Sequence, residues 1–261
     1  MPGVRCDIAD ERATVTLENQ DQRNALTAEV ATELRSALSE IESAAPRCVV
    51  LQGAGETFCA GGDIQSMRAT QESDEDAETA LEEFALPINR AVQAVYECEA
   101  PTVAKVDGAA FGAGAALAVA CDVVLASEGA RISFGFRQVG LSVDSGTSYL
   151  LSRLVGENTA KELVYTGELL GSERAEDLGL LNRVFPAEEF EGRAADVVDR
   201  IATGPTVALK QSKQLLETEH DSFDDAVEAE AEGLAVTVQT ADHAEGLAAF
   251  TADREPEFRG E

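Results

Sequence analysis

The chain has 261 residues, 44% of them hydrophobic, and its 49 acidic and 20 basic side chains give a formal net charge of −29. This length and apolar content are typical of a folded protein with a substantial core. The negative charge makes nucleic acid and anionic membrane surfaces poor partners, because both need a basic surface. The acidic residues are spread along the whole chain, a composition typical of proteins adapted to high salt, where screening cancels the repulsion between carboxylates.

Composition also limits the location and the metal chemistry of the chain. The longest uncharged apolar stretch, residues 108–121, is broken by glycines and shorter than the roughly 20 residues that a membrane span needs. The first residues lack the apolar core of a signal peptide, so we expect a cytoplasmic protein. The five cysteines form no close pair, and the two histidines have no ligand-like spacing with them. We therefore expect buried, reduced thiols and no metal site.

Apolar periodicity predicts alternating strands and helices up to about residue 185 and only helices beyond Pro186. Strands are expected at residues 14–17, 48–51, 101–106, 121–126 and 131–134. Helices are expected from the cap Thr27 to residue 41 and at residues 84–97, 145–155 and 157–165. The acidic stretch at residues 71–83 has few apolar residues and is expected to be a mobile surface segment. The predicted fold class is α/β with a helical C-terminal third.

Two segments rich in glycine and alanine, residues 58–64 and 108–116, stand out in this pattern. Each follows an apolar run that predicts a strand, and each leads into a helical pattern. Turns of this kind expose backbone N–H groups. Two such turns side by side would place two donors on one ligand oxygen, which is the arrangement that stabilises a developing oxyanion.

Several short motifs occur in a fixed order along the chain: residues 23–26, 58–64, 108–122, 140–156, 165–168, 249–250 and 256–258. With these motifs the chain resembles the crotonase family, the enoyl-CoA hydratase/isomerase superfamily, over nearly its full length. The resemblance implies a spiral of ββα units over residues 1–200 and a C-terminal helical region over residues 201–261. It also implies a homotrimer or hexamer and an acyl-CoA thioester as substrate, with no separate cofactor.

The resemblance also assigns roles to individual residues. It implies that the peptide N–H groups of Ala60 and Ala113 form the oxyanion hole, and Ala113 would lie at a helix N-terminus, where the helix dipole favours negative charge. For Asp63 a helix cap is an equally good interpretation. The positions implied along the CoA or acyl path are Arg23, Ala25, Gly61, Gly62, Asp63, Ile64, Gly112 and Phe136.

The chain departs from the family's hydratase pattern at both catalytic glutamates. The matching positions are Ala116, three residues after Ala113, and Phe136, just after the strand at residues 131–134. Water addition needs a water molecule held and deprotonated and a proton delivered to carbon, which suits paired carboxylates. Neither alanine nor phenylalanine can do this.

Asp144 is the candidate replacement, because family isomerases carry an acidic residue in this loop, which is most similar to that of ring-epoxide phenylacetyl-CoA isomerases. A single carboxylate can remove a proton and return it further along the acyl chain, and a neighbouring apolar wall would raise its basicity. The structural alternative is an N-cap for the helix starting at Ser145. The preferred function is an acyl-CoA isomerase; the alternatives are an enoyl-CoA hydratase and an acyl-CoA binder with little catalysis.

Overall fold

A computed structural model describes residues 3–72 and 76–261. Six strands form the main sheet in the order β1-β2-β3-β5-β7-β10, parallel except for the β1–β2 pair. Their bounds are β1 Val4–Ala9, β2 Arg12–Leu17, β3 Cys48–Gly53, β5 Thr102–Val106, β7 Val123–Ser127 and β10 Arg183–Phe185. Four short strands, β4 Thr57–Cys59, β6 Ala109–Phe111, β8 Arg131–Ser133 and β9 Leu170–Gly171, form a second sheet in that order.

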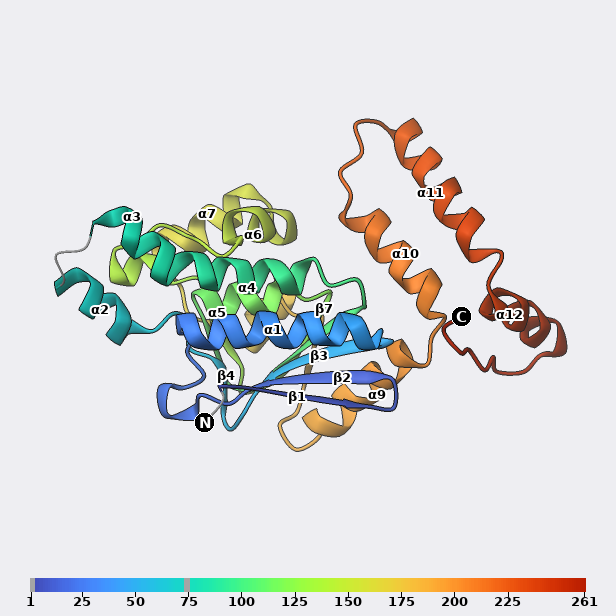
Figure 1. Cartoon of the computed structure of the whole chain (residues 1–261), viewed down its shortest axis with the longest axis horizontal. Coiled ribbons are helices and arrows are strands. Elements are labelled where there is room, and N and C mark those ends of the chain that lie inside the picture. Colours follow the sequence, from blue (N-terminus) through green and yellow to red (C-terminus); the bar gives the residue numbers. More distant parts are fainter. Residues whose placement is uncertain (1–2, 73–75) are drawn as a thin grey trace.

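Helices cover both faces of the main sheet (Figure 1). Because side chains alternate along a strand, Val49 and Leu51 of β3 point to one face and Cys48 and Val50 to the other. The first face packs against α1 Ala28–Ala44, α4 Leu86–Tyr96 and α5 Ala113–Val119, and the second against α9 Phe190–Ala202. The sheet is therefore buried on both sides, as is usual for parallel strands.

The remaining helices extend this core. They are α2 Ile64–Glu72, α3 Ala77–Ala80, α6 Thr147–Val155, α7 Glu157–Thr166, α8 Ser172–Asp177, α10 Thr206–Glu217, α11 Phe223–Thr237 and α12 Ala241–Ala252. Figure 1 shows α10, α11 and α12 projecting away from the sheet. Across the described residues no helix is long and apolar enough to cross a membrane.

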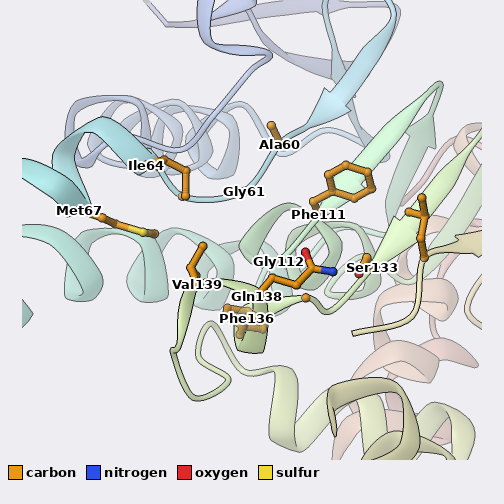
Figure 2. Close-up of a pocket in the computed structure, with 13 residues that line it drawn as sticks. Ala60, Gly61, Ile64, Met67, Phe111, Gly112, Ser133, Phe136, Gln138 and Val139 are labelled. Carbon is orange, nitrogen blue, oxygen red and sulfur yellow. The ribbon is translucent and has the colours of Figure 1, made fainter. Parts of the chain in front are cut away.

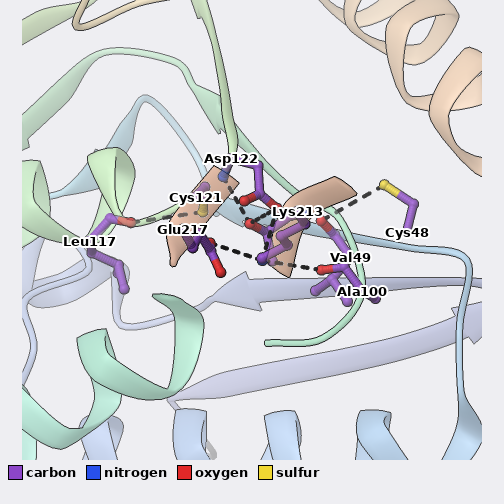
Figure 3. A network of polar contacts seen from close by, with 9 residues as sticks. Cys48, Val49, Ala100, Leu117, Cys121, Asp122, Lys213 and Glu217 are labelled. Atoms are coloured by element: carbon purple, nitrogen blue, oxygen red, sulfur yellow. Dashed lines mark hydrogen bonds and ion pairs between the residues drawn. The ribbon is translucent and has the colours of Figure 1, made fainter. Parts of the chain in front are cut away.

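One partly exposed ion pair ties the projecting helices to the sheet (Figure 3). The Nζ of Lys213 in α10 lies 2.9 Å from Oδ2 of Asp122, the residue before β7, and donates to the Ala100 carbonyl at 3.5 Å. Asp122 also accepts hydrogen bonds from the N–H and hydroxyl of Thr102, at 2.7 and 2.9 Å. These contacts fix the position of α10 at the edge where β5 and β7 begin.

The predicted α/β class, the five predicted strands and the helical C-terminal third are confirmed. Thr27 caps α1 by accepting a hydrogen bond from the Val30 N–H at 3.1 Å. In the described part of residues 71–83, residues 71–72 end α2, and residues 77–85 form α3 and a π-helical turn, Leu81–Ala85. Most of these residues are exposed, so the segment lies at the surface as predicted but is helical, and its mobility stays a prediction. Alanine, leucine and glutamate there favour helix, while residues 73–75 lie outside the described residues.

Candidate active site

Each of the two glycine- and alanine-rich segments contains a short strand of the second sheet, β4 or β6, followed by a turn and a helix. The two turns are in contact. A Cβ atom added at Gly61 would lie only 2.5 Å from the carbonyl oxygen of Phe111 and 3.6 Å from the nitrogen of Ala113. Gly61 has a φ of +92°, which L side chains rarely adopt. Glycine at this position therefore allows the two turns to lie side by side.

A cavity of about 270 Å³ opens where these turns meet (Figure 2). Gly61, Gly62 and Ile64 line it from one turn, Gly112 from the other, and Phe136 from the 3₁₀ turn after β8. The full lining is Ala60, Gly61, Gly62, Ile64, Met67, Phe111, Gly112, Ser133, Gly135, Phe136, Gln138, Val139 and Leu169. The walls are mostly apolar, and none of these described residues is acidic.

The structure corrects one of the two predicted oxyanion donors. The Ala60 N–H donates to the carbonyl of Arg23 at 3.0 Å, so it is already used within the fold. The Gly62 N–H has no acceptor among the described residues, and Gly62 lines the cavity. The sequence could not show that the Ala60 N–H is occupied, because its acceptor, the Arg23 carbonyl, lies nearly forty positions earlier in the chain.

The N–H of Ala113 remains available as the second donor. Ala113 is the first residue of α5, and its N–H has no acceptor in the part of the chain that the structure describes. The preceding Gly112 has a φ of +53° and donates its own N–H to the Ser133 carbonyl at 2.8 Å. The first N–H groups of a helix lack partners inside the helix and lie at the positive end of its dipole. This turn can therefore hold an anionic oxygen.

Asp63 acts as a helix cap in the structure, which corrects its assignment to the ligand path. Its side chain is only 7% exposed. Oδ1 accepts a hydrogen bond from the Gln65 N–H at 3.0 Å, and Oδ2 accepts from the N–H and hydroxyl of Ser66 at 3.2 and 2.6 Å. Both oxygens are thus occupied at the start of α2.

The other residues predicted along the ligand path fall into two groups. Gly61, Gly62, Ile64, Gly112 and Phe136 line the cavity. Arg23 and Ala25 do not: Arg23 is exposed with a left-handed backbone, and Ala25 is buried.

Asp144 lies in the loop that leads from the cavity wall to α6. It is not among the cavity-lining residues, but Phe136, Gln138 and Val139 of the same connection are. Its Oδ1 is buried and has no hydrogen-bond partner among the described residues. Burial raises the pKa of this carboxyl, while a hydrogen bond with the Ser145 side chain opposes the shift.

The N-cap interpretation of Asp144 is wrong. Helix α6 begins at Thr147, its N-cap is Gly146, and no side chain caps it. Of the two positions that match the hydratase glutamates, Ala116 is fully buried and Phe136 lines the cavity.

Comparison with known proteins identifies the family. Residues 8–261 match the family described as Enoyl-CoA hydratase/isomerase. The chain belongs to this family. The crystal structure of the enoyl-CoA hydratase from Bacillus anthracis superimposes on this chain with a TM-score of 0.91. The two chains are 29% identical, and the match covers 99% of this chain and 100% of that one.

Two relatives of the chain carry names that describe different reactions. A Rhodobacter capsulatus protein named "Probable enoyl-CoA hydratase" is 35% identical over 263 residues, covering 98% of each chain. The 1,2-epoxyphenylacetyl-CoA isomerase of Escherichia coli is 31% identical over 250 residues, covering 95% of this chain and 94% of its own. Similarity over the whole chain therefore establishes the enzyme family, but it does not establish which reaction the protein performs.

Proposed function

We propose that this protein is an acyl-CoA isomerase that moves a double bond, or rearranges a ring-derived acyl group, through a thioester enolate. The observation that carries the proposal is the half-buried Asp144 carboxylate, which caps no helix and has one buried oxygen, Oδ1, without a hydrogen-bond partner among the described residues. A carboxylate oxygen buried without a hydrogen-bond partner is costly in a fold, and carboxyl groups with raised pKa values are found at functional sites.

In the proposed reaction the thioester carbonyl oxygen accepts hydrogen bonds from the N–H groups of Gly62 and Ala113. Asp144 removes a proton from the α-carbon of a 3-enoyl-CoA, and the electron pair moves onto the thioester oxygen. Asp144 then returns the proton to the γ-carbon, which gives the 2-enoyl-CoA. Each oxyanion donor is typically worth about 2.7–4 kcal/mol in such a transition state.

The lining of the cavity supports isomerisation over hydration. In the hydratase pattern, water addition uses paired carboxylates, which hold and deprotonate the water and deliver a proton to carbon. Ala116 and Phe136 occupy the two glutamate positions of the hydratase pattern. Proton transfer by a single carboxylate needs no bound water, so an apolar wall is compatible with it.

We also propose that the protein works as a homotrimer or hexamer. Several large apolar side chains of the projecting helices are exposed in the single chain, including Leu216, Phe223, Leu234, Leu247 and Phe250, with Leu216, Phe223 and Phe250 more than 80% exposed. Such a surface favours association with further copies of the chain. Sedimentation equilibrium in molar salt tests this proposal, and a monomer at micromolar concentration would overturn it.

The function is tested by incubating the purified protein in molar KCl with three substrates. These are a linear 3-enoyl-CoA, crotonyl-CoA and a ring-epoxide phenylacetyl-CoA. Conversion of the first or the third, with negligible hydration of crotonyl-CoA, supports the isomerase. Efficient hydration of crotonyl-CoA would show a hydratase, and binding of all three esters without turnover would show an acyl-CoA binder.

A further inference from the structure

Asn89, in the middle of α4, contacts the loop that carries Asp144. Its Oδ1 accepts a hydrogen bond from the Ser145 N–H at 3.0 Å and lies 3.2 Å from the Ser145 hydroxyl oxygen, which donates to it. The two residues are 56 positions apart in the sequence. Ser145 is only 2% exposed, so these contacts form away from water. Their loss would leave a buried donor without a partner.

The backbone of this loop needs such support. Ser145 has a φ of +51°, and Gly146 follows with a φ of +73°. A serine in the left-handed region is strained, and such a conformation persists only where surrounding contacts determine it. The Asn89 side chain supplies two hydrogen bonds to the strained residue itself.

We propose that Asn89 is a positioning residue, which holds Ser145 in its left-handed conformation and thereby aims the neighbouring Asp144 carboxylate at the acyl group. This inference rests on the proposed isomerase function. Asp144 Oδ1 has no partner of its own within the described chain, so the orientation of the carboxylate depends on the backbone that carries it. A displacement of about 1 Å in a reacting group can lower a rate about 100-fold.

The Ser145 hydroxyl links Asn89 and Asp144 in a second way. It has one proton, and while it donates this proton to Asn89 Oδ1 it cannot donate it to the Asp144 carboxylate. A hydrogen bond from this hydroxyl to Asp144 lowers the pKa of that carboxyl, opposite to the effect of burial, and no charged side chain of the described residues contributes to the shift. By engaging the hydroxyl, Asn89 keeps Asp144 a stronger base.

The test compares Asn89→Leu with Asn89→Asp and with the control Gln93→Leu. Gln93 lies one turn further along α4, is exposed, and donates from its side-chain amide to Glu97 at 2.7 Å, with no hydrogen bond to Ser145 in the described part of the chain. Asn89→Leu should lower kcat roughly 10- to 100-fold and leave KM within about twofold of the wild type. It should also move the acid limb of the pH profile, the fall in kcat at low pH as Asp144 becomes protonated, to lower pH, because the freed Ser145 hydroxyl can then donate to Asp144. Asn89→Asp keeps an oxygen that can accept from Ser145, so its kcat should be close to that of the wild type. Its acid limb should lie at higher pH, because the added negative charge raises the pKa of Asp144. Gln93→Leu should match the wild type.

Hydrogen exchange provides a readout independent of turnover. Peptides that cover residues 141–150 should exchange faster in Asn89→Leu than in the wild type and in Gln93→Leu, while the rest of the chain remains protected. If Asn89→Leu unfolds, Ser145→Ala, which deletes only the hydroxyl that donates to Asn89 Oδ1, takes its place. Peptides covering residues 141–150 should then exchange faster than in the wild type, and exchange at the wild-type rate would overturn the inference.

Activity of the Asp144→Asn variant separates the two possible failures. If Asp144→Asn abolishes isomerisation but Asn89→Leu keeps the wild-type kcat and exchange pattern, the positioning role is wrong and the proposed function stands. If Asp144→Asn retains activity, or the wild type does not isomerise either substrate, the proposed function fails and the inference fails with it.

Discussion

The Thr147 N–H donates to the backbone carbonyl of Asp144 at 2.9 Å, and not to its carboxylate. The start of α6 is thus closed by main-chain atoms, in a position where an aspartate side chain would ordinarily cap a helix. The carboxylate therefore does not cap α6, and its buried Oδ1 has no hydrogen-bond partner among the residues that the structure describes. The absence of a stabilising role is the reason to look for a chemical one.

Replacing this carboxylate should stabilise the protein at neutral pH. Because burial raises the pKa of Asp144 in the folded state, folding is most favoured while the carboxyl is protonated, and stability falls as the pH rises through the raised pKa. We expect Asp144→Asn to have a higher Tm than the wild type at pH 7, and expect this difference to shrink below about pH 4, where the unfolded carboxyl is protonated too. Thermal unfolding at several pH values measures this. Asp196→Asn, on the exposed face of α9, should show no such difference, and a lower Tm for Asp144→Asn at pH 7 would contradict the account.

Removing the Ala113 N–H should impair catalysis without breaking α5. Proline is tolerated at the first position of a helix, where its missing N–H has no intrahelical partner. We expect Ala113→Pro to lower kcat about 100- to 1,000-fold, measured with the substrate that the wild type converts. The matched control is Ala28→Pro at the first position of α1, which should keep wild-type activity. Equal losses in the two variants would argue against a role for the Ala113 N–H.

Separating the two turns should destabilise the fold. Gly61→Ala places a Cβ 2.5 Å from the Phe111 carbonyl oxygen, at a φ of +92°. We expect a loss of about 1–3 kcal/mol in the free energy of unfolding from backbone strain alone, measured by urea denaturation, together with lower activity. Gly192→Ala in α9, where an added Cβ meets no atom within 4 Å, should instead leave stability unchanged or raise it by up to about 1 kcal/mol. A Gly61→Ala variant as stable as the wild type would show that the turns are not in close contact.

The net charge of −29 predicts a strong effect of salt on stability. The screening length falls from about 10 Å at 0.1 M to about 3 Å at 1 M salt, so repulsion between surface carboxylates should decline across this range. We propose that the protein is adapted to high salt and expect its Tm to rise between 0.1 and 2 M KCl. Calorimetry at fixed pH measures the change, and a Tm that is constant or falls would count against this adaptation.

Local patterns were enough to predict the elements that position the site. The cap Thr27, the apolar runs at residues 48–51 and 101–106, and the small residues after them gave the correct order of strands, turns and helices. Strand β1 and the short strands β4, β6, β9 and β10 were not predicted, and two or three residues carry little periodicity. The use of the Ala60 N–H by Arg23 and the contact of Asn89 with Ser145 depend on segments distant in sequence. The residues that flank each position in the sequence do not indicate such long-range contacts.

The role of Asp144 as the acid–base group is tested most directly by kcat for isomerisation by Asp144→Asn, measured in molar KCl beside the wild type and Asp196→Asn. Loss of a general acid–base group lowers rates by about 100- to 10,000-fold, so we expect a fall of this size in Asp144→Asn, with unchanged affinity for the CoA ester and full activity in Asp196→Asn. A folded Asp144→Asn variant with wild-type kcat would contradict this role.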